Sequence, residues 1–494
     1  MKKDLYRTRI SKSLDENVLS FLSSLKDDLW IAEEDIIGTE VHNIMLYEQN
    51  ILNKQEINEI LISLEKIRKK LQKNKLKLNK KFEDIHPFIE SLIIEDIGID
   101  IGGKIHTGRS RNDQVSVDIR LKIRKELNIL TQEMFNLFDS IISVSEKAVD
   151  AYMPLYTHLQ KAQLGSFAHY TNNYLAQILR IINRIDESYN RINKNPLGAC
   201  AIGGTSIRIN RERTTELLGF DNLIINSIDA ISSRDYIYDT LSILNLLGLH
   251  ISRIAEDLMI WSTEEFGFIE LDDKLCSVSS VMPQKKNPDT VELTRSKSSI
   301  LINNLFKACL MIKAIPSGYF RDFQELKPIL QESFRIAHSI LKIQDGLFLS
   351  LKLNRKRMIS KINDSYIMAL DLAEFLVEKY DIPFRKSHQI VANLVKEADN
   401  PEDLFNKKKL KDLILEIHNK EIDVSDNFGE KIKNIKYCME NRISRGSPSK
   451  KEIDEYIKIL QKEKDKAYKK YVERKYKLKK AEELRNKLID DLTS

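Results

Sequence analysis

The feature that most limits the possible folds is the run from Val115 to Val149, which contains neither Gly nor Pro. Apolar residues recur in it at steps of three and four, for example at Ile119, Leu127 and Ile141, and this spacing places them on one face of an α-helix. At 1.5 Å per residue the helix is about 50 Å long. Because so long a helix must bury its apolar face along other helices, the sequence predicts an elongated helical bundle that other subunits complete.

Other segments repeat this pattern. Glu56 to Leu71, Ser166 to Asn195 and Arg234 to Leu246 also lack Gly and Pro. Gly and Pro together number 16 + 10 = 26 of 494 residues, less than half of the usual share of roughly 12%. We therefore expect an all-α protein, and its length predicts two or three domains.

The overall charge is weakly basic, because 79 Lys and Arg exceed 73 Asp and Glu by six. This small excess suits a small anionic substrate better than a nucleic-acid surface. The four cysteines lack paired spacing, and the N-terminal residues lack the apolar run of a signal peptide, so we expect a cytoplasmic location. No window approaches about 18 consecutive apolar residues, and we expect no membrane partner.

The helical pattern shortens after Ser350, and Pro383 separates two short helical segments. We predict an N-terminal, mostly helical domain over 1–106, a long-helix bundle domain over 107–357 and a small helical domain over 358–494. A charged extension from about residue 450 has sparse apolar positions: Ile453, Ile457, Leu460, Ala467, Leu478, Leu484 and Leu488. A surface helix or two fits this pattern better than an RNA-binding tail, because acidic residues interrupt the lysines.

The stretch "CSVSSVMPQKKNPD", Cys276 to Asp289, has no amphipathic period. Pro283 and Pro288 prevent a helix, and almost nothing in the stretch is apolar enough to bury. It predicts a mobile surface loop that either closes over an anion or is only an exposed linker.

Three further polar segments stand out. In "GGKIHTGRSRNDQV" the residues from Arg109 to Gln114 precede the long helix, where they suit either a carboxylate or helix capping by Asn112 or Asp113. "MPLYTHLQKAQ" brings His158 next to a break between helices, although a lone histidine is more often structural. "SGYFRDFQELK" contains Tyr319, Arg321, Gln324 and Lys327 and says little alone.

Together these segments resemble the argininosuccinate lyase branch of the fumarase and aspartase superfamily. The superfamily loop has the form Gly-Ser-x-x-Met-x-x-Lys-x-Asn, and this chain has Val278, Ser279, Met282, Lys285 and Asn287 there. "HTGRSRNDQ", "YTHLQ", "EDIH" and "PFR..H" are similar to that branch specifically. The resemblance runs from about Ser24 to Pro448, and the tail beyond is longer than the family usually has.

The resemblance implies a three-domain helical subunit in a homotetramer, whose long helices form one central bundle. It also implies that loops from three different subunits meet in each active site. The implied reaction is the reversible elimination of argininosuccinate to arginine and fumarate through an aci-carboxylate intermediate. It implies neither a metal nor an organic cofactor.

Roles for single residues also follow from the resemblance. Ser279 is the implied base, Lys285 and Asn287 bind the carboxylate that gains charge, and His158 protonates the leaving nitrogen. Glu292 orients and charges His158. The implied catalytic residues are Ser279, His158, Glu292 and Lys285. The implied substrate-binding residues are Ser24, Arg111, Asn112, Thr157, Asn287, Tyr319, Gln324 and Lys327.

The clearest departure is Val278, which stands where the family has Gly and restricts the backbone beside the implied base. Because Ser279, His158, Lys285 and Asn287 are all present, we expect an active enzyme. One alternative keeps the fold but takes the substrate of adenylosuccinate lyase, aspartase or fumarase, although "HTGRSRND" and "YTHLQ" argue against it. Another is a structural protein without activity, like the lens crystallins derived from this fold. A third makes the tail an RNA- or partner-binding module.

Overall fold

The structure is a computed structural model that describes residues 14–494. Helices dominate these residues, and their only strands form four two-stranded sheets. The prediction of an all-α fold is therefore confirmed. The helices that precede the bundle are α1 (Glu16–Leu22), η1 (Asp27–Trp30), α2 (Ala32–Glu48), α3 (Lys54–Gln72), α4 (Ile85–Ile97) and α5 (Ile99–Gly102).

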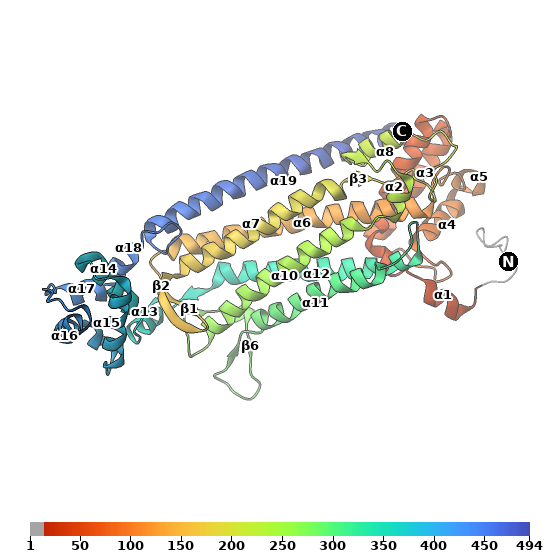
Figure 1. The fold of residues 1–494 in the computed structure, drawn as a ribbon. Coiled ribbons are helices and arrows are strands. Elements are labelled where there is room, and N and C mark those ends of the chain that lie inside the picture. Colours follow the sequence, from red (N-terminus) through yellow and green to blue (C-terminus); the bar gives the residue numbers. More distant parts are fainter. Residues whose placement is uncertain (1–13) are drawn as a thin grey trace.

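Five long helices form an elongated bundle (Figure 1). They are α6 (Arg111–Lys147), α7 (Phe167–Ile192), α10 (Asp235–Ser262), α11 (Asp289–Ile312) and α12 (Leu326–Ser350). Successive helices run in alternate directions, so that α6, α10 and α12 begin at the end next to the N-terminal helices. The opposite end carries the C-terminal helices α13 (Arg355–Asn363), α14 (Ala369–Tyr380), α15 (Phe384–Lys396), η4 (Pro401–Phe405), α16 (Lys407–His418), α17 (Phe428–Lys433) and α18 (Ile435–Glu440).

Short elements connect the bundle helices. At the N-terminal end these are α8 (Arg211–Leu217), α9 (Ser227–Ser232), η3 (Arg321–Glu325) and the parallel pair β3 (Lys194–Asn195) and β4 (Asn222–Leu223). At the other end, β1 (Tyr152–Thr157) and β2 (Gln160–Ser166) form an antiparallel hairpin in which Thr157 faces Gln160. The antiparallel pairs β5 (Ile269–Glu270) with β8 (Lys352–Leu353) and β6 (Ser277–Val278) with β7 (Lys286–Asn287) lie there too, together with η2 (Asp273–Leu275).

The long helix α6 begins four residues before its predicted start, at Arg111. Ser110 is its N-cap and accepts a hydrogen bond from the backbone N–H of Asn112, while the Asp113 side chain accepts one from the N–H of Ser110. This capping box satisfies donors that the first helical turn leaves free. Helix capping does occur here, but the cap is Ser110 and not Asn112 or Asp113.

The three largest hydrophobic cores of the described residues follow one another along the molecule. The bundle encloses the first, which contains Leu127, Ile141 and Phe334. The second lies among α2, α3 and α4, and the third among the C-terminal helices. The boundaries at 106 and 357 stay predictions.

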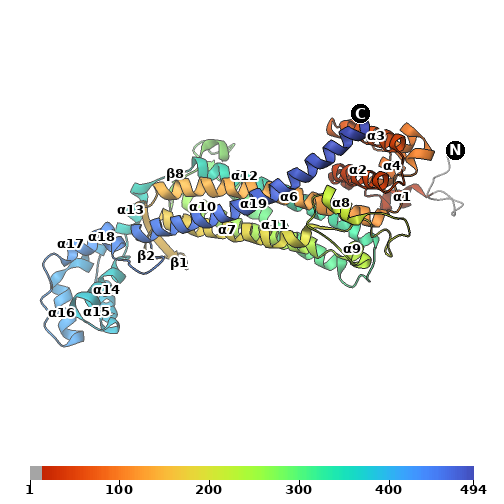
Figure 2. The same ribbon diagram turned by 90° about the horizontal axis from the view of Figure 1, so that it is seen from above.

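The charged C-terminal segment forms one continuous helix, α19 (Lys450–Thr493). It leaves the C-terminal helices, crosses the outside of the bundle and ends beside α3 (Figure 2). Its first half contributes Ile453, Leu460 and Tyr471 to the bundle core, and Leu492 belongs to the N-terminal core. The helix therefore links the core of the bundle with the N-terminal core.

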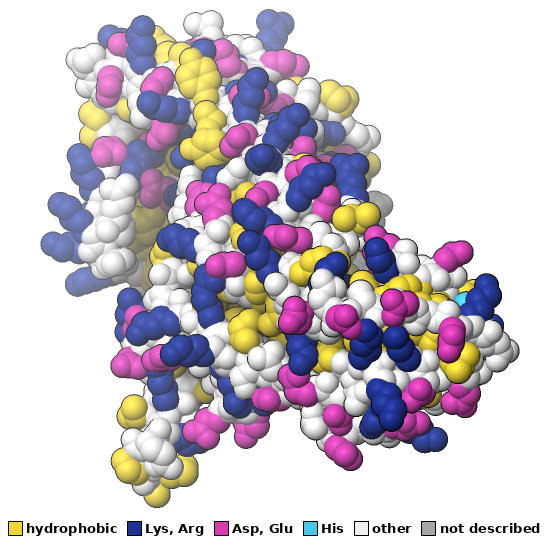
Figure 3. Space-filling view, turned by 90° about the vertical axis from the view of Figure 1, so that its left-hand side faces the viewer, with side chains coloured by type: hydrophobic (Ala, Val, Ile, Leu, Met, Phe, Trp, Pro, Cys, Tyr) yellow, Lys and Arg dark blue, Asp and Glu magenta, His cyan; other side chains and the backbone are white. Residues whose placement is uncertain are grey.

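Basic and acidic side chains alternate on the face shown in Figure 3, without a large area of one sign. The hairpin β6–β7 projects from the bundle as a separate lobe (Figure 1). Val278 and Val281 are 82% and 83% exposed on it. Among the described helices, none has the length and apolar character needed to span a membrane.

Candidate active site

A cavity lies at the N-terminal end of the bundle, where the starts of α6 and α12 meet η3 and the residues around α4. Five of the predicted substrate-binding residues line it: Ser24, Arg111, Tyr319, Gln324 and Lys327. Lys327 and Ser24 are 303 positions apart in the chain. The fold thus brings together side chains from distant segments, and Arg234 and Arg321 add positive charge to the same cavity.

Lys327 is fixed at the base of this cavity by an ion pair with Asp28. Both side chains are at most 4% exposed. Ser24 Oγ donates to Asp28 Oδ2 over 2.8 Å, and the backbone N–H of Ile85 donates to the same oxygen over 3.2 Å. Because its charge is paired and hydrogen-bonded, Lys327 is held in one position inside the protein.

Arg111 occupies the wall of the cavity and pairs with Asp84 across 2.6 Å. Burial disfavours its charged form, but the Asp84 carboxylate outweighs this effect and raises the pKa of Arg111. The neighbouring Asn112 donates through Nδ2 to the carbonyl of Ala201 over 2.9 Å. Both side chains belong to the first turn of α6, whose capping box fixes their direction.

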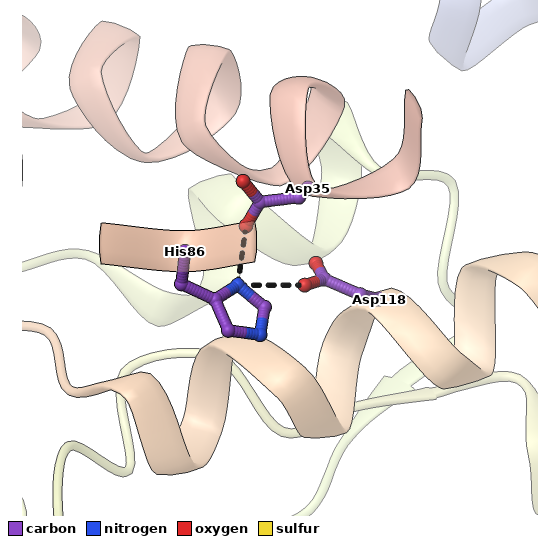
Figure 4. Close-up of side chains that lie close together, drawn as sticks. All are labelled: Asp35, His86 and Asp118. Atoms are coloured by element: carbon purple, nitrogen blue, oxygen red, sulfur yellow. Dashed lines mark hydrogen bonds and ion pairs between the residues drawn. The ribbon is translucent and has the colours of Figure 1, made fainter. Parts of the chain in front are cut away.

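A buried histidine that lines the cavity, His86, lies beside two carboxylates (Figure 4). His86 Nδ1 is 2.9 Å from Asp35 Oδ1 and 3.6 Å from Asp118 Oδ2. Burial opposes ionisation of Asp35, yet His86 and Arg109 lower its pKa, whereas burial and the Asp35 charge raise the pKa of Asp118 well above its usual range. The surroundings therefore favour the ionised form of Asp35 more than that of Asp118.

The ligand atoms of Asp35, His86 and Asp118 all lie within 4.8 Å of one another. Their types suit a divalent cation. The Arg109 guanidinium, which is 6% exposed, already supplies positive charge to both carboxylates. We therefore interpret the group as a structural network that joins α2, α4 and α6.

Thr157 and His158 lie at the opposite end of the bundle, where Thr157 ends β1 and His158 begins the turn to β2. His158 and Leu159 have φ angles of +55° and +57°, a backbone region that costs non-glycine residues energy. Both side chains are exposed. A strained, exposed turn that presents a histidine is typical of a functional segment.

Ser279, Lys285 and Asn287 belong to the projecting hairpin β6–β7, in which two short strands frame the surface loop expected from the sequence. Ser279 Oγ accepts hydrogen bonds from the N–H groups of Val281 and Met282 over 3.2 and 3.0 Å. The reactive atom proposed from the sequence thus caps a turn in this conformation. Lys286 anchors the hairpin base through Asp273 at 2.6 Å, and this contact outweighs desolvation and raises the Lys286 pKa.

The predicted site residues therefore form two groups within one chain. At the start of α6 are Ser24, Arg111, Asn112, Tyr319, Gln324 and Lys327. At the other end are Thr157, His158, Ser279, Lys285, Asn287 and Glu292. The 24 residues of α11 separate the two ends, which corresponds to about 36 Å.

Sequence reasoning missed several residues of the cavity. Asp28, Asp84 and Arg234 pair with, or lie beside, the predicted binding residues. Asp28 stands four positions after Ser24, and Asp84 belongs to the "EDIH" motif. The spacing of Asp28 from Ser24 and the motif around Asp84 can both be read from the sequence. Only the fold shows that Asp28 pairs with Lys327 and Asp84 with Arg111.

Two family models match the chain. The model described as "Lyase" matches residues 8–302, and the model described as "Argininosuccinate lyase C-terminal" matches residues 366–440. The first match alone covers more than half of the chain.

Curated relatives agree with these matches. A protein of Nitrosopumilus maritimus named argininosuccinate lyase is 44% identical over 394 residues, which are 80% of each chain. One of Methanocaldococcus jannaschii with the same name is 39% identical over 97% of this chain and 98% of its own length. The second match must extend into α19, so the long C-terminal helix has a counterpart in at least one relative.

Solved structures show the same fold. An EDDS lyase in complex with formate has a TM-score of 0.86 and 25% identity, and covers 99% of this chain and 98% of its own. A class II fumarase from Schistosoma mansoni has a TM-score of 0.69 and 15% identity, over 84% and 91%. Together with the family models, these similarities show that the chain is a lyase and belongs to the argininosuccinate lyase family of the fumarase and aspartase superfamily.

Proposed function

We propose that this chain catalyses the reversible elimination of argininosuccinate to arginine and fumarate. The observation that carries the proposal is the basic cavity at the start of α6, where the predicted binding residues meet in a chain whose relatives are named argininosuccinate lyase. A substrate with carboxylates on both halves needs several cationic and amide partners. Arg111, Lys327 and Gln324 supply such partners in the cavity.

The difficult chemical step is the removal of a proton α to a carboxylate, because that proton is a very weak acid. In our proposal Ser279 removes it, and Lys285 and Asn287 bind the aci-carboxylate as its negative charge develops. A serine hydroxyl is a poor base, so a nearby cation and a closed, dry site must favour its alkoxide. The exposure of the hairpin supports this role, since a segment packed in the core is unable to move over a substrate.

Elimination then breaks the bond between the succinyl carbon and the guanidinium nitrogen. His158 donates a proton to the leaving nitrogen, and Glu292 stabilises the charged form of His158. These residues lie in the β1–β2 turn and in the first turn of α11. We propose that they meet across a subunit interface, together with Thr157.

A homotetramer with sites shared between three subunits fits the division of the site residues into two distant groups. Exposed apolar side chains on the bundle also support assembly, because a soluble monomer rarely exposes many of them on neighbouring helices. They are Leu249 on α10, Leu293, Phe306 and Leu310 on α11, and Leu349 on α12. In our proposal these faces meet in a central bundle built from all four chains.

We place the enzyme in the cytoplasm and in arginine biosynthesis. The four cysteines are all free, which suits a reducing compartment. Elimination in the forward direction releases arginine, so the reaction completes the synthesis of this amino acid when it runs that way.

The primary test is the fumarate absorbance that develops when purified protein meets argininosuccinate. We expect fumarate from the parent protein and none from Ser279→Ala, with the folded state of the variant checked by circular dichroism. Adenylosuccinate, aspartate and malate serve as alternative substrates and should not react. Turnover of one of these instead would reassign the substrate, and a parent that releases no fumarate from any of them would support the structural-protein alternative.

A second test concerns the shared site. Ser279→Ala removes a group at one end of the bundle, and Arg111→Gln removes one at the other. Co-expression of these two inactive variants should restore part of the activity, because some sites in a mixed tetramer then receive both intact residues. Mixed tetramers that are isolated through two different tags and remain inactive would contradict the shared arrangement.

A further inference from the structure

The cations of the cavity at the start of α6 differ in how their charge is balanced. Four cationic side chains line the cavity, and three of them have a carboxylate partner. The ion pairs are Arg111 with Asp84 at 2.6 Å, Arg321 with Glu83 at 2.9 Å, and Lys327 with Asp28. The fourth cation, Arg234, takes part in none of the ion pairs found among residues 14–494.

Arg234 is only 2% exposed, and part of its guanidinium is bound to the backbone. Nη1 donates to the carbonyls of Ile231 and Ser233 over 2.9 and 2.7 Å. The guanidinium carbon stands 4.2 Å from the centre of the Phe323 ring. These contacts hold the side chain in place beside the cavity that both Arg234 and Phe323 line.

The other edge of the guanidinium has no partner. Nε and Nη2 are buried and form no hydrogen bond in the part of the chain that the structure describes. A buried donor without an acceptor is costly, and a buried charge without an anion is more so. Two N–H groups side by side on one edge match the spacing of the two oxygens of a carboxylate.

We infer that Arg234 binds a carboxylate of the substrate through its Nε and Nη2 edge. The inference rests on the proposed lyase function and deepens it, because it adds one cation to the residues that hold the substrate. Backbone carbonyls and Phe323 orient the guanidinium before the substrate arrives, which reduces the entropy lost on binding. The substrate then supplies the carboxylate that the other three cations of the cavity already have.

Arg120 offers a matched control. It is also a buried arginine, 3% exposed, with its guanidinium 3.8 Å from the centre of an aromatic ring, that of Tyr236. Its Nη1 donates to two backbone carbonyls as well, each over 3.0 Å. Arg120 does not line the cavity, so its replacement perturbs a similar structural setting without touching the proposed subsite.

The experiment compares Arg234→Lys and Arg120→Lys in the full-length enzyme, because lysine keeps the charge but lacks the two-pronged edge. For Arg234→Lys we expect the KM for argininosuccinate to rise about tenfold or more. Binding of either fumarate or arginine, measured separately by calorimetry, should weaken by a similar factor, and this identifies the half of the substrate that Arg234 holds. For Arg120→Lys we expect KM and both binding constants to stay within about twofold of the parent.

Several results would overturn the inference. One is an Arg234→Lys enzyme with unchanged KM and unchanged binding of both products. Another is an equal loss in both lysine variants that follows their loss of thermal stability, since this indicates a structural role alone. A parent without turnover would refute the lyase proposal, but fumarate or arginine binding that still depends on Arg234 would uphold the carboxylate subsite by itself.

Discussion

Replacement of Arg474 by alanine tests whether α19 is held on the bundle by specific contacts. The Arg474 side chain is 8% exposed. Its Nε donates to Asn128 Oδ1 over 2.8 Å, and its guanidinium lies 4.4 Å from the centre of the Tyr189 ring. Burial lowers the pKa of Arg474, so part of the gain from these contacts offsets the desolvation of the charge.

The size of the effect follows from these contacts. A hydrogen bond that involves a charged group contributes about 1.5–3 kcal/mol, and a desolvated cation–π contact contributes about 1–2 kcal/mol. After the relief of desolvation is subtracted, we expect a net loss of about 2 kcal/mol. This corresponds to an increase of about 30-fold in the equilibrium constant for the local detachment of α19.

Hydrogen exchange resolved to peptides measures this local opening directly. Amides of the second half of α19 should exchange about 30-fold faster in Arg474→Ala, whereas those in the middle of α6 should keep their protection. Lys469→Ala is the control, because Lys469 is exposed on the same helix. Equal exchange of α19 in both variants would show that the buried guanidinium contributes nothing, and the assignment of α19 as a fixed link would fail.

Three further perturbations give distinct results. Hydrogen bonds to Glu126 and Glu133 outweigh desolvation and raise the pKa of His338 from 6.5 to about 9. Protonated His338 therefore stabilises the fold fully below pH 6.5, and this contribution is lost as the pH rises through 9. After a discount for the partial exposure of His338, this contribution to the free energy of unfolding is about 1–2 kcal/mol. The fall in melting temperature between pH 6 and pH 9.5 should therefore be smaller in His338→Gln than in the parent protein. Val278→Gly should raise the turnover number in the fumarate assay with little change in melting temperature, because Val278 is 82% exposed and glycine eases rearrangement of the hairpin; an unchanged turnover number would show that position 278 does not limit closure. Ser110→Ala should lower the free energy of unfolding by about 1 kcal/mol and raise KM, since the cap orients the first turn of α6. Ser110→Asp, which retains a cap, should restore the free energy of unfolding in denaturant titrations and KM in steady-state kinetics.

The bundle was predictable because its helices are long and poor in Gly and Pro. The apolar pattern of α6 marks the helix from Val115, and the structure adds one polar turn from Arg111 that only a cap analysis of Ser110 and Asp113 predicts. For the candidate site, the sequence proposes residue types but no geometry. Ser24 and Lys327 carry no signal of their contact, because nothing local in the sequence encodes a pairing across 303 positions.

The continuous helix α19 illustrates a signal that was present but hidden. Buried or half-buried positions alternate at steps of four and three: Ile453, Ile457, Leu460, Lys464, Ala467, Tyr471, Arg474, Leu478, Ala481, Arg485, Leu488 and Leu492. This is the heptad spacing of a helix that packs along another helix. Three of these packed positions are charged, namely Lys464, Arg474 and Arg485. A search for apolar residues alone therefore finds only a sparse pattern. Charged side chains with long apolar stems fill such positions when aromatic rings and amides lie opposite them.

The distance between the two groups of site residues limits how they act together. Ser279 is three residues from Cys276, where the hairpin begins, and Cys276 follows directly after η2. A fully extended chain spans at most about 3.6 Å per residue, so Ser279 stays within about 11 Å of Cys276 and can move by at most about 22 Å. The start of α6 is about 36 Å away, the length of α11. Ser279 and Lys327 can therefore act on one substrate molecule only if they come from different chains. In the proposed tetramer, closure of the hairpin completes a neighbour's site, and separating the subunits should abolish activity even where each chain stays folded.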